Sequence, residues 1–200
     1  MRNRGIVFAL ALVMSFPAVS IAHDHAQFDA AKPLPGRSLY NLQSQWTNQD
    51  GASVALASLR GEPAIVAMGY ATCRDICPTI VANMAWIERH MPARAAGRVR
   101  FAFFSFDPDA DTPERLKLYA EGHGLDPANW TLLTSDADTA RDLAAALNVG
   151  YRPDGKGGFD HAAVITLLDA EGNVAFQQRG AEASSKELLE KLGELFRRAN

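Results

Sequence analysis

The chain has 200 residues, of which 48% are hydrophobic and 22% are charged. This length and this apolar content are enough for one packed domain, and they exclude a chain that is disordered throughout. The net charge is -3 and the basic residues form no stripe, so nucleic acid is not expected as a partner.

The first 22 residues have the order of a secretory signal peptide. Two arginines precede an apolar run over 6–16, and small residues follow up to Ala22. We expect cleavage after Ala22, with Ser20 nearly as good, and a mature chain of net charge -5 in the periplasm or another extracytoplasmic compartment. Because 5–22 contains no charge, an uncleaved anchor that tethers the protein to the membrane stays open. An oxidising compartment of this kind permits disulfides.

Residues 23–37 are expected to be an extended, polar lead-in to a domain over 38–200. After cleavage at Ala22 the mature chain would begin with His23, Asp24 and His25. The free amine, two backbone amides and the third-position imidazole can surround Cu(II) in a square plane. A solvated polar lead-in explains the same residues, and N-terminal sequencing separates the two interpretations.

The domain is expected to open with a β-hairpin and a buried strand. Residues 38–61 alternate between apolar and polar side chains on both sides of a turn signal at 48–51. The run 63–70 is nearly all apolar, as in a strand buried on both faces. The segment that holds the chain's two cysteines, Cys73 and Cys77, follows this strand directly.

The middle of the chain alternates between strands and helices. Pro78 begins a helical repeat of apolar residues, because proline suits the first position of a helix. Thr112 is the expected N-cap of a second helix. The expected elements are a helix over 78–91, a strand over 99–106, a helix from 113 to 122 or 124, a strand over 130–135 and a helix over 136–149.

The last quarter of the chain contains a loop, a hairpin and a closing helix. The expected elements are a glycine-rich loop over 150–161, a hairpin over 162–180 and an amphipathic helix over 184–200 capped by Ser184 or Ser185. Together the elements predict an α/β fold with a mixed sheet and helices on both faces. The cysteines then lie at the carboxyl end of the strand over 63–70, where sites occur in open α/β sheets.

Cys73 and Cys77 are compatible with three kinds of chemistry. Their spacing lets the two sulfurs approach each other, so they can form a redox-active disulfide or a permanent structural one. Two thiolates are also two arms of a soft metal site that favours Cu(I). Pro78 disfavours helical angles at Cys77, which favours a Cys73 that lies in the loop before the helix.

An imidazole is the expected third ligand of such a site. His90 ends a helix and His123 lies between two glycines after a helix, so both are most simply structural. His161 follows the glycine-rich loop and precedes a strand, with Asp160 beside it. A histidine at the start of a strand is more often structural than a ligand, so spacing alone leaves its role open.

Three segments together resemble the Sco/SenC family, whose members take part in the assembly of cytochrome c oxidase. The segments are GYATCRDICP at 69–78, SFDPDADTPE at 105–114 and FDHAAVITLLDAEGN at 159–173. The resemblance covers roughly Ser38 to Leu195. It implies a thioredoxin-like fold with an N-terminal β-hairpin.

The resemblance also implies a site and a function. Copper would be bound by Cys73, Cys77 and His161, with Asp160 orienting the imidazole. The implied protein is a monomeric, exported copper chaperone for the copper A site of the oxidase, with oxidase subunit II as its partner. The alternative is an enzyme, a thiol-disulfide reductase in which Cys73 attacks and Cys77 resolves, acting on the cysteines of subunit II or of other exported proteins.

Overall fold

The structure is a computed structural model that describes residues 34–181 and 184–198. The expected signal peptide over 1–22 and the histidines at 23 and 25 lie outside the described residues. Among the described residues, no helix is both long enough and apolar enough to cross a membrane.

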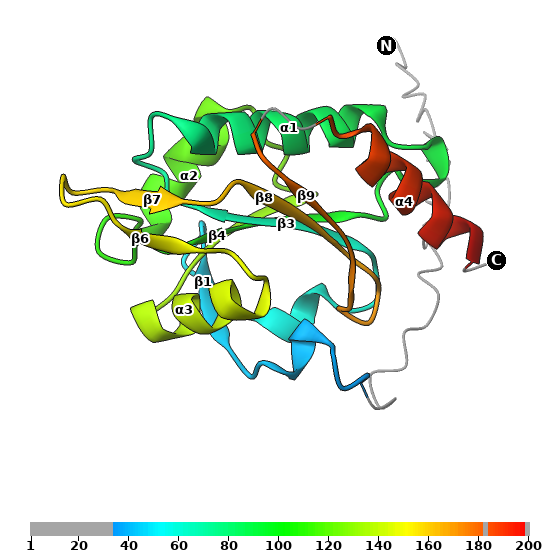
Figure 1. The fold of residues 1–200 in the computed structure, drawn as a ribbon, viewed down its shortest axis with the longest axis horizontal. Helices are drawn as coiled ribbons and strands as arrows, with labels where there is room; N and C mark the ends of the chain where they lie inside the picture. The colour runs from blue at the N-terminus through cyan, green and yellow to red at the C-terminus, as the bar shows by residue number, and fades with distance from the viewer. Residues whose placement is uncertain (1–33, 182–183, 199–200) are drawn as a thin grey trace, which may run out of the picture. The chain divides into compact units, whose positions relative to one another are not determined.

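The fold is built on a seven-stranded mixed sheet (Figure 1). Its strands are β1 (Gln45–Asn48), β2 (Ser53–Ala55), β3 (Ala64–Gly69), β4 (Arg100–Ser105), β5 (Trp130–Thr134), β8 (Val164–Leu168) and β9 (Val174–Arg179). The strand order is β2-β1-β5-β4-β3-β8-β9. The central strands β3, β4 and β5 run parallel, whereas the β1–β2 and β8–β9 hairpins join the sheet antiparallel.

Helices cover both faces of this sheet. They are α1 (Ile76–His90), α2 (Pro113–Gly122), α3 (Ala137–Ala146) and α4 (Lys186–Arg198), with short 3-10 turns η1 (Leu39–Asn41), η2 (Leu56–Leu59) and η3 (Ala93–Ala95). One core contains Val66 and Met68 of β3 together with α3, and the other contains Ile65 and Ala67 of β3 together with α1, α2 and α4. Successive β3 side chains therefore point to opposite cores, and the expected thioredoxin-like sheet with an N-terminal hairpin is confirmed.

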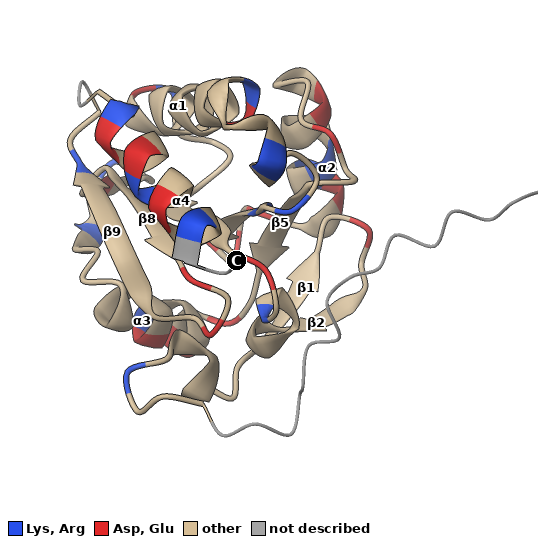
Figure 2. Cartoon of the chain, turned by 90° about the vertical axis from the view of Figure 1, so that its right-hand side faces the viewer, with Lys and Arg blue, Asp and Glu red and all other residues tan. Residues whose placement is uncertain are grey.

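The helix boundaries follow local chemistry. The Thr112 side chain accepts a hydrogen bond from the Arg115 N–H, so the expected cap of α2 is confirmed. In α4, Leu188 and Leu192 are fully buried against the sheet. Acidic and basic residues are interleaved along α4 (Figure 2).

Two expectations about local structure are wrong. Helix α1 begins at Ile76 and therefore includes Cys77, although Cys77 precedes a proline. Pro78 falls within the first turn, where backbone N–H groups have no acceptor inside the helix, so its missing donor costs nothing. Cys73 does lie in the loop before the helix, as expected.

The second correction concerns the segment expected to be a loop. Residues 150–161 contain a two-stranded antiparallel ribbon of β6 (Tyr151–Pro153) and β7 (Phe159–His161), at the left end of the molecule in Figure 1. The Asp154 carboxylate closes its turn by accepting the N–H groups of Lys156 and Gly158. Strands this short show too little alternation to be detected from sequence.

Candidate metal centre

The candidate site lies where the parallel strands end. Strand β3 stops at Gly69, and the Cys73 N–H donates to the Tyr70 carbonyl, which turns the chain toward α1. Cys73 lies in this turn and Cys77 in the first turn of α1. His161 ends β7 and comes from a part of the sequence more than eighty residues away from Cys77.

The structure brings the two sulfurs and one imidazole together. The Sγ atom of Cys77 lies 3.1 Å from Nε2 of His161. One ligand atom from each of Cys73, Cys77 and His161 lies within 4.8 Å of the others. Such a spacing suits a single ion bound by all three, with thiolate and imidazole bonds of about 2.0–2.3 Å.

The backbone sets the orientation of the imidazole. Nδ1 of His161 lies 3.2 Å from the carbonyl oxygen of Ala162, so a proton on Nδ1 is donated to this carbonyl. Nε2 then keeps its lone pair directed at the sulfurs. Asp160 was expected to orient the ring, but its carboxylate instead accepts two hydrogen bonds from the Arg152 guanidinium and is exposed. The role expected of Asp160 belongs to the Ala162 carbonyl.

The pKa values of the two cysteines are shifted in opposite directions. Burial acts to raise the pKa of Cys73, but hydrogen bonds from the backbone at Cys77, Asp75 and Ile76 outweigh it and lower the pKa. Burial also raises the pKa of Cys77 strongly, and the nearby Cys73 adds to this rise. Cys73 is therefore the thiol of the pair that loses its proton more readily, and Cys77 the one that keeps it.

Burial lowers the pKa of His161, although its bond to the Ala162 carbonyl acts in the opposite direction. The imidazole is thus neutral at pH 7, as a metal ligand must be. Gly69 leaves room beside the ligands, because a Cβ at this position would lie 2.9 Å from the Cys77 sulfur and 2.6 Å from the Phe103 ring.

An aromatic cluster holds the ribbon that carries His161. The rings of Phe106 and Tyr151 are stacked with centroids 4.6 Å apart, and the Phe106 and His161 rings meet edge-on at 5.1 Å. The Tyr70 hydroxyl accepts the N–H of Phe159 at 3.2 Å. Sequence reasoning missed these residues, although Tyr70 and Phe106 each directly follow a buried strand and thus sit at the edge where sites form.

The buried carboxylate of Asp111 accepts a hydrogen bond from the loop that leads to Cys73. Asp111 has no solvent exposure and accepts hydrogen bonds from the Ser105 hydroxyl at 2.6 Å and from the Ala71 N–H at 2.9 Å. Burial raises its pKa, although these two hydrogen bonds act against the rise. Asp111 thereby fixes the backbone two residues before Cys73. Its sequence signal was its place in the SFDPDADTPE segment.

The other described histidines are structural, as expected. His90 stacks on Trp86 with ring centroids 4.1 Å apart, and its Nδ1 lies 2.8 Å from the Trp86 carbonyl. His123 follows the end of α2 and packs against Tyr119. Within the described part of the chain, Cys73, Cys77 and His161 form the one cluster of metal-ligating side chains.

Comparison with known proteins gives a consistent result. The family model SCO1/SenC matches residues 35–197. The SCO1 protein homolog of Bacillus subtilis is 30% identical over 138 residues, which are 68% of this chain and 71% of that protein.

Two solved structures share the fold. The copper-bound structure of ScoI from Bradyrhizobium japonicum is 29% identical, with a TM-score of 0.62 over 76% of this chain and 95% of that one. BsSco is 27% identical, with a TM-score of 0.66 over 76% of this chain and 90% of that one. It is described as a member of the Sco family of cytochrome c oxidase assembly proteins in which a disulfide switch was identified. Since the family model spans most of the chain, and the curated relative agrees with it, this protein belongs to the SCO1/SenC family.

Proposed function

We propose that this protein binds one copper ion through Cys73, Cys77 and His161 and carries it to cytochrome c oxidase during assembly. The observation that carries the proposal is the convergence of two sulfurs and one imidazole nitrogen within 4.8 Å. Two relatives support the proposal. ScoI from Bradyrhizobium japonicum was solved with copper bound, and BsSco is described as a member of a family of cytochrome c oxidase assembly proteins.

The donor set fits Cu(I) as cargo. Thiolates are soft ligands that favour Cu(I), and imidazole also suits copper. Cys73 loses its proton more readily than an ordinary thiol, because its pKa is lowered, whereas the raised pKa of Cys77 means that its proton leaves as the ion binds. Three protein ligands leave the ion open to an incoming ligand from another protein, which a carrier requires.

The destination and the location are part of the proposal. We propose that the recipient is the copper A site of oxidase subunit II, that the segment 1–22 directs export, and that the domain over 38–200 acts outside the cytoplasm. The order of basic, apolar and small residues in 1–22 supports export. Either cleavage or retention of this segment is compatible with the proposed function.

A second candidate is a thiol-disulfide reductase. In that reaction the Cys73 thiolate attacks a partner disulfide and Cys77 resolves the mixed disulfide, so that two electrons pass to the partner and Cys73 and Cys77 become a disulfide. The lowered pKa of Cys73 favours the attack. The raised pKa of the buried Cys77 disfavours the resolving step, so copper delivery is the better supported function.

Copper titration of the reduced protein separates the two candidates. Loss of the imidazole in His161→Ala is expected to weaken Cu(I) binding by more than about ten-fold, which is the lower limit for removing even an outer partner of a metal ligand. His90→Ala serves as the matched control, because His90 stacks on Trp86 away from the cysteines. Disulfide exchange should persist in both variants. Wild-type copper affinity in His161→Ala would rule out the three-ligand site.

A further inference from the structure

A leucine on the outer side of α2 is exposed to solvent. The large hydrophobic side chains that are exposed in the described part of the chain are Leu118, at 68%, and Val174, at 44%. Leu116, two positions earlier on α2, is fully buried. Leu118 thus points away from the core on the outer face of α2.

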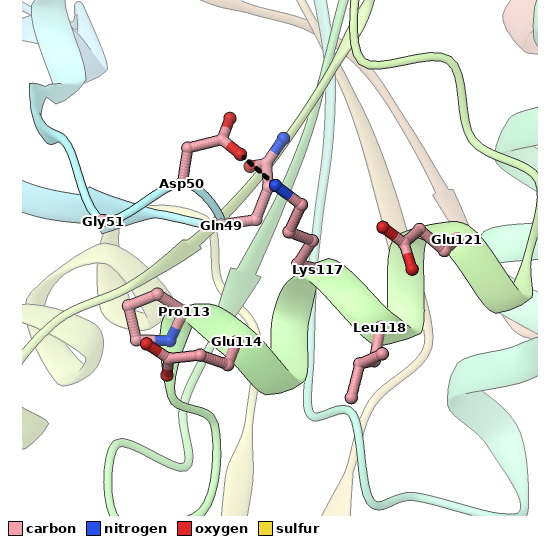
Figure 3. A pocket seen from close by; sticks show the side chains of 8 residues that line it. All are labelled: Gln49, Asp50, Gly51, Pro113, Glu114, Lys117, Leu118 and Glu121. Atoms are coloured by element: carbon pink, nitrogen blue, oxygen red, sulfur yellow. Dashed lines mark hydrogen bonds and ion pairs between the residues drawn. The ribbon is translucent and has the colours of Figure 1, made fainter.

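Two adjacent hollows flank this leucine. The first, of about 440 Å³, lies between α2 and the β1–β2 turn (Figure 3). The second, of about 610 Å³, lies on the other side and reaches Ala71, two residues before Cys73. Leu118 and Glu114 line both hollows, so the two hollows adjoin along α2. We call the two adjoining hollows together the α2 groove. Glu114, Leu118 and Glu121 form the part of its wall that belongs to the exposed side of α2.

The α2 groove has an acidic rim. Lys117 is neutralised by Asp50, with Nζ and Oδ1 3.1 Å apart, and Figure 3 shows this ion pair across the first hollow. Among residues 34–181 and 184–198, no ion pair joins Glu114 or Glu121 to a basic side chain. Asp109 adds a third carboxylate and Arg115 one positive charge.

The second hollow is connected to the loop before Cys73 through the Asp111 carboxylate. It is lined by Asp109 and Thr112, on either side of Asp111. Asp111 accepts the Ala71 N–H and so ties this acidic segment to the loop that presents Cys73. A protein seated in the second hollow would therefore contact Ala71, two residues before Cys73.

We propose that the α2 groove docks a basic segment, with an apolar side chain at its centre, on the protein that receives the copper. The apolar side chain covers Leu118, and lysine or arginine side chains approach Glu114 and Glu121. Buried apolar anchors surrounded by a charged rim supply most of the affinity and steer the encounter. This inference rests on the proposed function, since it names where that recipient binds.

The first test measures docking without metal. Reduced, metal-free protein is titrated calorimetrically with the metal-free, copper-binding domain of oxidase subunit II from the same organism. Leu118→Gln is expected to raise the Kd by about ten-fold, as for loss of an apolar interface anchor. Val174→Gln, which changes an exposed hydrophobic residue on β9, is the matched control and should bind as wild type does.

The second test uses charge. Association of the wild-type protein should weaken as salt is raised, because exposed charges are screened. The double variant Glu114→Gln/Glu121→Gln should bind less tightly and lose most of this salt dependence. Glu187→Gln/Glu190→Gln on α4 is the matched control, since it removes the same charge from another helix and should leave the salt dependence unchanged.

The outcomes separate this inference from the proposed function. Wild-type affinity in Leu118→Gln, or no detectable association of the wild-type protein with the domain, overturns the docking site. A wild-type dimer that Leu118→Gln dissociates also overturns it, because a second copy would then occupy the groove. Copper affinity is measured separately and should be unchanged in all four variants; failure of the His161→Ala titration would instead contradict copper binding itself.

Discussion

Cys73 and Cys77 are chemically different although only three residues separate them. Cys73 lies in a turn where backbone N–H groups stabilise its thiolate, whereas Cys77 is fully buried in the first turn of α1. Burial without a compensating positive charge disfavours the charged form of a thiol. Both thiols are buried, so the structure assigns the reactive role to Cys73 through its lowered pKa and the unreactive one to Cys77 through its raised pKa.

This difference predicts the order of alkylation. In reduced, metal-free protein, Cys73 should react with iodoacetamide at least about ten-fold faster than Cys77 near pH 7, because the thiolate is the nucleophile. Since the pKa of Cys73 is lowered, its rate should stay high below the pH at which a free thiol loses reactivity. Mass spectrometry of the peptide that contains both cysteines measures the order. Equal rates, or earlier labelling of Cys77, would contradict the assignment.

At the scale of elements, the β6–β7 ribbon decides where the imidazole lies. Among the described strands, β6 and β7 pair only with each other, so β-ladder bonds do not attach the ribbon to the main sheet. Its attachment comes from the aromatic cluster and from the Tyr70 hydroxyl, which bonds to the Phe159 backbone. Gly158 allows this approach, because a Cβ there would lie 2.8 Å from that hydroxyl.

Removal of the Tyr70 hydroxyl should therefore weaken copper binding. Tyr70→Phe keeps the ring and loses the two hydrogen bonds of the hydroxyl to Phe159, one from the N–H at 3.2 Å and a longer one to the carbonyl oxygen at 3.5 Å. A hydrogen bond of this kind is worth about 0.5–1.5 kcal/mol. We expect Cu(I) affinity to fall by about two- to ten-fold, because the ribbon presents His161 less firmly. Competition with a Cu(I) chelator measures the change.

A double-mutant cycle shows whether the effect passes through the imidazole. In the His161→Ala background, Tyr70→Phe should have no further effect on copper affinity. Additive losses in the double variant would show that Tyr70 acts on the cysteines instead. Tyr151→Phe is a suitable control, since its ring stacks on Phe106 and would be retained.

Some helices and strands were predicted from the sequence and others were not. The hairpins, the buried strands and the capped helix α2 were predicted, because alternation, apolar runs and an N-cap are local signals. The start of α1 and the β6–β7 ribbon were not. Tertiary packing around Phe106 holds the ribbon in place. Helix α1 begins at Ile76, before Pro78, because the N–H groups of its first turn have no acceptor inside the helix and the missing N–H of proline costs nothing there.

For the molecule as a whole, the candidate site joins segments that are distant in the chain. The cysteines follow β3, which lies between β4 and β8 in the sheet. His161 precedes β8. A ligand that binds only the folded state stabilises that state by mass action. An ion bound to all three side chains should therefore act on global stability.

Copper should stabilise the reduced protein against unfolding. With free Cu(I) at about 100 times the Kd, the free energy of unfolding should rise by about 2.7 kcal/mol. For a domain of this size the Tm then rises by roughly 5–10 °C, and a chelator reverses the gain. Differential scanning calorimetry measures it. The control is Cys73→Ser/Cys77→Ser, and an equal gain in that variant would place the copper elsewhere.

The sequence by itself determined the types of chemistry and most of the fold. Two thiols before a helix, apolar runs of strand length and three family-like segments were enough to indicate an α/β domain and a soft metal site. These features are local, so composition and periodicity reveal them. The ligand residues were named through resemblance, because spacing left the role of His161 open.

The tertiary structure decided the rest. It placed Nε2 of His161 beside the Cys77 sulfur and shifted the pKa values of the two thiols in opposite directions. It gave the orientation of the imidazole to the Ala162 carbonyl instead of Asp160, and it left Leu118 exposed beside the α2 groove. Each of these depends on which distant segments pack together and on how much solvent they exclude. Burial and neighbouring dipoles set the pKa of a group, and neither can be read from its position in the chain.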